Sequence, residues 1–325
     1  MPNIYDAINQ FNLDLSARES QQFAEMTKRW AQMEGRLSSY IQQHADAIAT
    51  RRDAGLAVGE TALTRLETWN RLEAQIVAES AQYQRYAQQV ISAEQQIYGE
   101  TGIAAAQSAI RAEVGAGVAF GRLNPQAVNN MVGIAGDGSP LFDVLKKRAI
   151  APDAVAGLQD ALIEAVTLGY SPRKTAKMMA DGLAQGLTKA LTIARTEQIR
   201  AYRTSSLMQY QESGIVTKYQ RHAAPSERTC LACIALDGKI YDVNEFASHP
   251  NCRCFMTPVI DGVNNPARST QSWLERQNDA TQKKILGGHY DAYKNGTPLA
   301  DMVKIVDDKT WGATIKIVPL KELTK

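Results

Sequence analysis

The chain has 325 residues, of which 44% are hydrophobic and 22% are charged. These values are ordinary for a soluble globular protein and exclude global disorder. Its 36 basic and 34 acidic residues nearly balance, which excludes a protein whose whole surface binds nucleic acid. The length is enough for two domains.

No targeting or membrane segment is expected. The first residues, MPNIYDAINQ, lack the basic and apolar regions of a secretory signal. The most apolar long stretch, 102–120, is rich in Ala and Gly and is interrupted by Arg111 and Glu113, so it is too weak for a membrane span. We therefore expect a protein made in the cytoplasm, with no membrane partner.

Two heptad patterns predict a long helical hairpin at the N-terminus. Phe23, Trp30 and Leu37 recur every seven residues, which predicts a helix over about 16–49. Trp69, Ile76, Tyr83, Val90 and Ile97 repeat the spacing in a second helix. The stretch TRRDAGLAVGET between them is typical of a turn, so the helices should pack antiparallel, chiefly to bury each other.

The next stretch changes in composition and predicts a connector. From Glu100 to Pro152 the chain is rich in Gly and Ala and contains LNPQ and AGDGSP. Helical patterns return at 153–168. Ser171 and Pro172 then have the residue types of an N-cap and a first helical position, and another helix from Leu187 should end at Gly214.

The C-terminal part combines short strands and helices. The runs VTKYQRHA and FMTPVI are β-prone and predict partner strands on either side of the cysteine-containing segment. A helix is expected over about 272–286, a second capping signal occurs at Thr297 and Pro298, and IKIVPL is a possible edge strand. The expected fold class is α+β and mainly helical, with a long antiparallel hairpin and a small antiparallel sheet beside a Cys/His loop.

All four cysteines fall within one short segment. Cys230 and Cys233 have C-x-x-C spacing, and the candidates His249, Cys252 and Cys254 follow closely. In a reducing compartment such a cluster favours a metal over a disulfide framework. Two disulfides and unrelated core thiols remain as alternatives.

Zinc is the metal that these ligand types favour. Thiolate and imidazole bind it tetrahedrally, and five candidates easily fill four positions, which leaves no place for a reactive water. A structural ion is therefore expected. Cys252 and Cys254 would face the same side of an extended strand, so the residues do not decide whether Cys254 or His249 is the fourth ligand.

Signatures of several enzyme classes are absent. Neither the H-x-E with P-C-x-x-C pattern of zinc deaminases nor the H-E-x-x-H of zincins occurs. Patterns G-x-G-x-x-G, Walker A and G-x-S-x-G are also missing. We expect no enzymatic activity.

A set of motifs in the second half of the chain resembles a known family. In order they are LGYSPRKTAKMM, ARTEQIRAY, ESGI, RTCLACIALDGKIY and HPNCRC. Together they resemble the phage Mu F-like head-morphogenesis family, the minor head proteins of tailed phages and prophages. With this resemblance the chain divides into a helical hairpin arm (1–110), a Gly/Ala-rich connector (111–152), a Mu F-like domain (153–260) and a C-terminal helical extension (261–325).

The resemblance implies a role in the virion. A member of this family is expected to be a low-copy structural protein of the phage head, acting in head morphogenesis and DNA packaging. Its partners would be the portal protein and a major capsid or scaffolding protein. It would reside in the host cytoplasm during assembly and then in the virion.

The resemblance also singles out Arg195, Thr196 and Glu197, a triplet that recurs beside the cysteine motif. Arg195 shares a helix face with Ile199 and Tyr202, so a structural guanidinium near the zinc loop is expected. The basic residues outnumber the acidic ones between Leu168 and Arg203, which permits non-specific contact with packaged DNA. The candidate binding residues are Arg195, Glu197, Arg200 and Arg203. The competing hypotheses are an ejected effector or enzyme and a non-specific DNA-binding zinc module.

Overall fold

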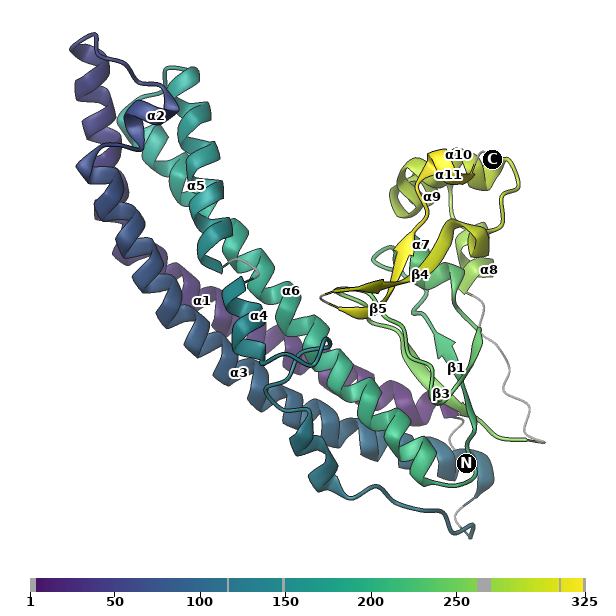
Figure 1. Cartoon of the computed structure of the whole chain (residues 1–325). Coiled ribbons are helices and arrows are strands. Elements are labelled where there is room, and N and C mark those ends of the chain that lie inside the picture. Colours follow the sequence, from purple (N-terminus) through teal and green to yellow (C-terminus); the bar gives the residue numbers. More distant parts are fainter. Residues whose placement is uncertain (1–3, 116, 148–149, 262–269, 310, 324–325) are drawn as a thin grey trace. The chain divides into compact units, whose positions relative to one another are not determined.

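The structure is a computed structural model that describes residues 4–115, 117–147, 150–261, 270–309 and 311–323. It is mainly helical, with small antiparallel sheets in the C-terminal part and the Cys/His cluster at residues 230–254, as the expected fold class requires (Figure 1). Among the described residues, no helix has the length and apolar character that a bilayer crossing needs.

The chain forms two compact units, each assembled from separate pieces of sequence. The first consists of residues 1–16, 93–138 and 195–325, and the second of residues 17–92 and 139–194. The division into four successive segments drawn from the sequence stays a prediction.

The second unit is built from long helices. Helix α1 (Ile4–Asp53) contributes its residues from Ala17 onward, and α3 (Glu67–Val114) contributes its residues up to Ser92. The two run antiparallel: Tyr83 donates a hydrogen bond to the Met26 carbonyl, and the ring of Trp30 meets that of Tyr83 edge-on at 4.9 Å. The short helix α2 (Glu60–Leu63) lies in the predicted turn.

Helix α1 is longer than its sequence pattern predicts. The heptad stripe predicts a start near residue 16, whereas the helix begins at Ile4. Ile4 and Ile8 pack against Ala109 in the first unit, so tertiary contacts extend the helix beyond its repeat. At its other end Arg51 and Arg52 occupy the last turn, where positive charge is favourable, and Gly55 follows with φ 67°.

Helices α4 (Leu141–Lys147) and α5 (Ile150–Thr167) and the first half of α6 (Pro172–Glu212) complete the second unit. The Ser171 hydroxyl accepts from the Lys174 amide at 3.4 Å, and Pro172 is the first residue of α6, as predicted. The helix predicted to begin at Leu187 is wrong as a separate element, because α6 continues through that residue. Its predicted end is confirmed, since α6 stops at Glu212 and Gly214 has φ 71°.

In the first unit, the end of α3 and the second half of α6 approach closely. The hydroxyls of Ser205 and Ser206 donate to the carbonyls of Gly99 and Gly102 at 2.7 and 3.0 Å. Tyr98 donates to the Leu15 carbonyl at 2.9 Å, which ties the start of α1 to the same core. The 3-10 helix η1 (Pro125–Asn130) follows α3.

A three-stranded antiparallel sheet follows α6, with β1 (Lys218–His222) in the centre between β2 (Ile240–Asp242) and β3 (Phe255–Val259). Both predicted strand runs are confirmed. Helix α7 (Leu231–Ala235) lies in the connection between β1 and β2, and the segment between β2 and β3 brings the chain back past α7. These two connections hold all the cysteines.

The C-terminal residues form short helices and a two-stranded antiparallel sheet. The helix predicted over 272–286 is divided into α8 (Thr270–Glu275) and α9 (Asp279–Leu286), where Asn278 caps α9. Then come η2 (Gly287–His289), α10 (Tyr290–Lys294), η3 (Leu299–Met302), β4 (Val303–Asp308), β5 (Gly312–Ile317) and α11 (Leu320–Leu323). The run IKIVPL thus supplies part of β5, which pairs with β4.

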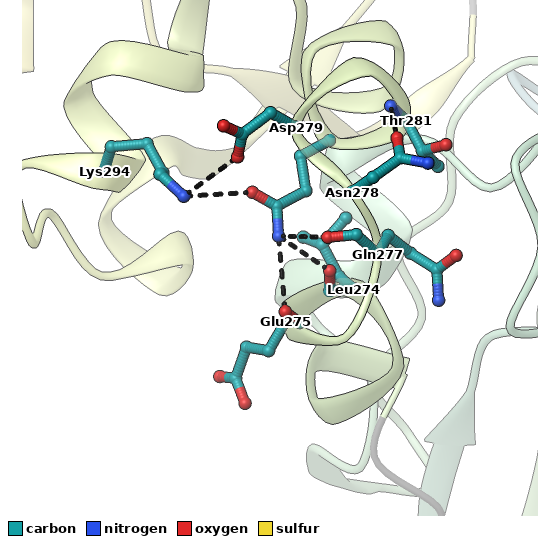
Figure 2. A network of polar contacts seen from close by, with 8 residues as sticks. Leu274, Glu275, Gln277, Asn278, Asp279, Thr281 and Lys294 are labelled. Carbon is teal, nitrogen blue, oxygen red and sulfur yellow. Dashed lines mark hydrogen bonds and ion pairs between the residues drawn. The ribbon is translucent and has the colours of Figure 1, made fainter.

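One buried amide joins α8 to α9. The Gln282 side chain donates to the carbonyls of Leu274, Glu275 and Gln277, and its oxygen accepts from Lys294 (Figure 2). These carbonyls lie at and just beyond the end of α8, where a helix leaves acceptors without intrahelical partners. Gln282 therefore serves as a side-chain cap for the preceding helix.

Candidate metal centre

The first half of the centre is the N-terminal turn of α7. Cys230 is its N-cap residue, and the Cys233 amide donates to the Cys230 carbonyl at 3.0 Å. This single turn aims both side chains to one side, as C-x-x-C spacing predicts. Cys233 is buried, whereas Cys230 is half-buried.

The second half is the loop that leads into β3. The Cys252 amide donates to the His249 carbonyl at 3.2 Å, and Asn251 between them has a left-handed backbone with φ 63°. The Asn251 amide donates to the Thr196 hydroxyl of α6 at 3.1 Å, which anchors this turn. Cys254 directly precedes β3.

The two halves converge so that all five predicted ligands gather. Cys230, Cys233 and His249 form one group that could hold a metal ion, and Cys233, Cys252 and Cys254 form a second, with donor atoms within 4.8 Å of one another in each. Cys233 belongs to both. All four cysteines are free, so the disulfide alternative is not what the structure contains.

The distances between donor atoms are near the edges of a tetrahedral site, although the contact between His249 and Cys233 is shorter. Sγ of Cys233 lies 3.6 Å from Sγ of Cys252, and Nε2 of His249 lies 3.0 Å from Sγ of Cys233 and 3.4 Å from Sγ of Cys230. A tetrahedron with metal–sulfur bonds of about 2.3 Å has sulfur–sulfur edges of about 3.8 Å and sulfur–nitrogen edges of about 3.5 Å. The cluster thus has the size of a coordination shell.

His249 is oriented for ligation. Its Nδ1 lies 2.8 Å from the Pro250 carbonyl oxygen, an acceptor, so Nδ1 carries the proton. Nε2, on the other side of the ring, is then the nitrogen that faces the sulfurs and would bind a metal ion held among them. A metal-bound histidine commonly has such a hydrogen bond to a backbone carbonyl on its other nitrogen.

Two buried arginines surround the same sulfur. Arg203 and Arg221 each donate to Sγ of Cys252 at 3.2 Å, and they are only 2% and 5% exposed. Arg203 also donates to the Cys254 carbonyl and the Ser248 hydroxyl, and Arg221 donates to the Ala247 carbonyl. A buried guanidinium requires a compensating negative charge, which thiolates supply. The arginines therefore indicate a centre with anionic sulfur.

The contacts among these sulfurs, arginines and His249 also shift the pKa values of the cluster residues. Hydrogen bonds from the Cys233 and Cys254 thiols, helped by the charges of Arg203 and Arg221, hold the pKa of Cys252 well below its usual value. Burial lowers the pKa of Arg221, but the charges on Cys254, Cys252 and Cys233 outweigh burial and raise it. Burial also lowers the pKa of His249, whereas its hydrogen bonds with Cys230 and Cys252 raise it to about 10.

The four candidate binding residues divide between two places. Arg203 belongs to the centre, and Arg195 lies at its edge, where Nη1 donates to the Asn251 side chain at 3.0 Å. Glu197 is fully buried and away from the sulfurs. It accepts from Arg200 at 2.7 Å and from the Gly136 amide at 3.3 Å, and burial raises its pKa. Arg200 also donates to the Ile134 carbonyl, so this pair fastens residues 134–136 to α6.

Sequence reasoning missed Arg221 as a partner of the centre. Arg221 and Cys252 are 31 residues apart, and Arg203 and Cys252 are 49 apart, so no local spacing signals the contact. The available signal is a charge in the middle of the otherwise β-prone run VTKYQRHA, where a buried face would exclude an unpaired arginine.

Comparison with family models matched residues 156–257 to the family described as phage Mu protein F like protein. No curated protein and no solved structure matched the chain. The matched range runs from within α5 into β3 and includes all five candidate ligands and both buried arginines. The resemblance read from the sequence motifs is thereby confirmed: residues 156–257, which hold the whole candidate metal centre, match the phage Mu protein F like family.

Proposed function

We propose that this chain is a minor head protein of a tailed phage or prophage that acts in head morphogenesis as a structural part of the virion. The observation that carries the proposal is the family match over 156–257, a range that also contains the Cys/His cluster. The portal protein and a major capsid or scaffolding protein are the proposed partners.

The proposed ion is zinc, in a structural role. Three or four thiolates with one imidazole are a donor set that zinc favours, and carboxylates, which calcium and magnesium need, are absent from the groups that could bind a metal among the described residues. A shell filled by protein ligands has no open position for a reacting water. The ion would join the turn of α7 to the loop before β3.

A structural role also accounts for Glu197. A buried carboxyl with a raised pKa is a usual candidate for acid–base catalysis. Here both oxygens of Glu197 are engaged, one by Arg200 and one by the Gly136 amide. We therefore propose that the chain is not an enzyme.

The basic run on α6 supports the head role over a dedicated DNA-binding module. Arg203 is buried at the metal centre, and Arg195 and Arg200 are half-buried and hydrogen-bonded, so only part of the run is exposed. The exposed members are Arg173, Lys174, Lys177 and Lys189. Four cations on one helix suit weak contact with packaged DNA but not a defined binding groove.

The test is incorporation into heads. Tagged wild-type protein should co-sediment with phage heads and retain zinc in near-stoichiometric amount by elemental analysis. Cys233→Ser removes the sulfur shared by both groups and should lose the zinc and reduce incorporation strongly. Ser38→Ala, which alters an exposed hydroxyl on α1, should change neither. Absence of the wild-type protein from heads would contradict the proposal.

Portal association needs its own experiment. Hydrogen exchange of the full chain, alone and with the portal protein, should show protection confined to one surface. No complex and no protection at moderate salt would remove the portal from the proposed partners, whereas complex formation only with DNA would favour the DNA-binding hypothesis.

A further inference from the structure

A cavity of about 530 Å³ opens within the first unit at the candidate metal centre, and all five candidate ligands, Cys230, Cys233, His249, Cys252 and Cys254, line it. Its walls come from the loop after β1, the turn of α7, the loop before β3 and the end of β5. Besides these ligands, its walls include Arg228, Pro250, Arg253, Ile315, Lys316 and Ile317. A single metal ion held between donor atoms within 4.8 Å of one another would fill only part of this space.

One wall of the cavity is an open edge of a sheet. Ser248 forms a parallel bridge with Thr314 of β5: its amide donates to the Ala313 carbonyl, and the Ile315 amide donates to the Ser248 carbonyl. Because Ile315 bonds outward to Ser248, its N–H and C=O point away from β4. The same holds for Ile317, two residues on, whose pairing with Val303 is of the same type.

Pro250 ends this ladder after one step. In a parallel ladder the next donor to the Ile315 carbonyl would be the amide of residue 250, which proline lacks. The Pro250 carbonyl, which would accept from the Ile317 amide, is instead 2.8 Å from Nδ1 of His249. The Ile315 C=O and the Ile317 N–H therefore have no hydrogen-bond partner among the described residues, and both belong to the stretch of β5 that lines the cavity.

The chemistry of the walls selects the partner of this edge. Arg228 and Arg253 are exposed, and Lys316 is shared with Asp308 at 3.0 Å. No Asp or Glu lines the described cavity, and the buried Arg203 and Arg221 compensate the negative charge of the thiolates that line it. Ala232, Ile315 and Ile317 give it an apolar side. A strand has side chains that alternate in direction, so acidic residues alternating with small aliphatic ones would satisfy both sides.

A nucleic acid fits this cavity less well than a peptide. No Phe, Tyr or Trp lines it, so bases would have no aromatic ring on which to stack. A phosphate can accept from the Ile317 amide, but it has no N–H to donate to the Ile315 carbonyl. A peptide backbone has both groups at the spacing of a ladder.

We propose that this cavity binds a short, extended, acidic segment of a partner protein, which adds as a strand to the open edge of β5. The segment continues the pairing that Ser248 begins, and Arg228, Arg253 and Lys316 set its preference for carboxylates. This inference extends the proposed head role by giving the chemistry of a partner segment, but it rests on the cavity and not on that role. Peptide binding and incorporation into heads are measured separately.

The test uses zinc-loaded full-length protein and fluorescein-labelled Asp-Val-Asp-Val-Asp, with binding followed by fluorescence anisotropy at low salt. We expect binding by this peptide and none by Lys-Val-Lys-Val-Lys. Methylation of the central backbone nitrogens of the acidic peptide should abolish binding, since it removes the ladder donors. No binding up to about 1 mM, the weak end of specific association, would overturn the proposal.

Matched variants distinguish loss of the open β5 edge from loss of the fold. Ile317→Pro removes the outward amide without touching the bonds between β4 and β5, and it should abolish binding. Ile305→Pro makes the same change at the opposite edge, because Ile305 pairs with Ile315 and also points its amide away from the neighbouring strand, so binding should persist. Arg228→Glu should weaken binding about tenfold, with zinc content unchanged.

Other outcomes identify a different occupant and would overturn the proposal. One is displacement of the peptide by a single-stranded oligonucleotide at equal charge. Another is self-association of the wild-type chain, seen by light scattering, that Ile317→Pro abolishes, because the edge then pairs with a second copy. Equal binding to wild type and Ile317→Pro would show that charge alone attracts the peptide.

Discussion

The guanidinium groups of Arg203 and Arg221 both donate to the sulfur of Cys252, so metal binding at this centre should depend on them. Groups that contact metal ligands commonly change metal affinity by about 10–100-fold when they are removed. Arg203 donates hydrogen bonds both to the Cys252 sulfur and to the Cys254 carbonyl. It therefore compensates the charge on that sulfur and also orients the loop before β3.

We predict that Arg203→Met lowers zinc affinity by about 10–100-fold, because methionine fills the space but supplies neither charge nor donors. The measurement is competition with a chromophoric chelator. Arg173→Met, at an exposed position on the same helix, is the control and should leave the affinity unchanged. Equal affinities for wild type and Arg203→Met would show that the guanidinium has no part in metal binding.

His44 gives the second unit a dependence on pH. It is fully buried beside Trp69, its Nδ1 lies 2.8 Å from the Thr68 hydroxyl, and burial lowers its pKa to about 4. The unfolded chain takes up a proton near pH 6.5, whereas the folded chain resists it. Stability is therefore complete above about pH 6.5 and falls as the pH drops towards 4.

From these pKa values, lowering the pH from 7 to 5 should cost about 2 kcal/mol through His44. Urea unfolding at the two pH values measures the loss, and His44→Gln, which keeps an amide near Thr68, should lose less by that amount. The comparison cancels the other titrating groups, including those of the metal centre. The same loss in both proteins would mean that His44 does not titrate differently on folding.

At the residue scale, the sequence predicts the ligands but not what surrounds them. C-x-x-C and the histidine and cysteines after it are local signals, since a turn of α7 and a loop each bring their own ligands together. The contacts of Arg203 and Arg221 arise only when α6, β1 and the loop before β3 assemble, and no periodicity records them.

Helices α5 and α6 show how close approach depends on glycine. A Cβ on Gly182 would lie against the backbone of Gly157 and Leu158, closer than van der Waals contact allows, and Gly157 faces Gly182 in the same way. Gly35 in α1 also lies inside a helix, but a Cβ there would meet nothing within 4 Å. The same substitution should thus have opposite effects at the two sites.

Gly182→Ala should destabilise the second unit by about 1–3 kcal/mol, because neither backbone can move without separating the helices. Gly35→Ala should stabilise it by about 0.5–1 kcal/mol, since alanine loses less conformational freedom in a helix. Thermal unfolding followed by circular dichroism gives both values. A gain in stability for Gly182→Ala would contradict the close approach of α5 and α6.

The elements that sequence patterns misplace have the same kind of explanation. The sequence pattern predicts a separate helix from Leu187, yet α6 continues through that residue, and Gly182 before it is used for packing and not for ending the helix. The break between α8 and α9 is signalled by Asn278 as a cap, but the apolar pattern on either side masks it. Strands β1 and β3 are easier to predict than these helix boundaries, because β-prone runs and turns mark them locally.

At the scale of the whole molecule, the candidate metal centre lies in one of the two units, among the residues that the structure describes. The first contains the sheet, the cysteines and the two buried arginines, whereas the second contains long helices held by apolar contacts and by the pair of Arg36 with the buried Glu79. Composition could not predict this division, because each unit combines segments that are distant in sequence. Patterns along the chain report neighbours in sequence, not in space.

Removal of the metal should therefore loosen one unit and spare the other. Without the ion, the sulfurs lose the bonds that would join the turn of α7 to the loop before β3, and structural zinc contributes up to about 10–16 kcal/mol in small modules. We expect a strong zinc chelator to increase hydrogen exchange in residues 218–259 while residues 17–92 keep their protection. Added Zn²⁺ should restore the original pattern, and Mg²⁺, which prefers oxygen ligands, should not. Uniform loss of protection would mean that the helices also depend on the ion, and an unchanged pattern would mean that the cysteine cluster folds without it.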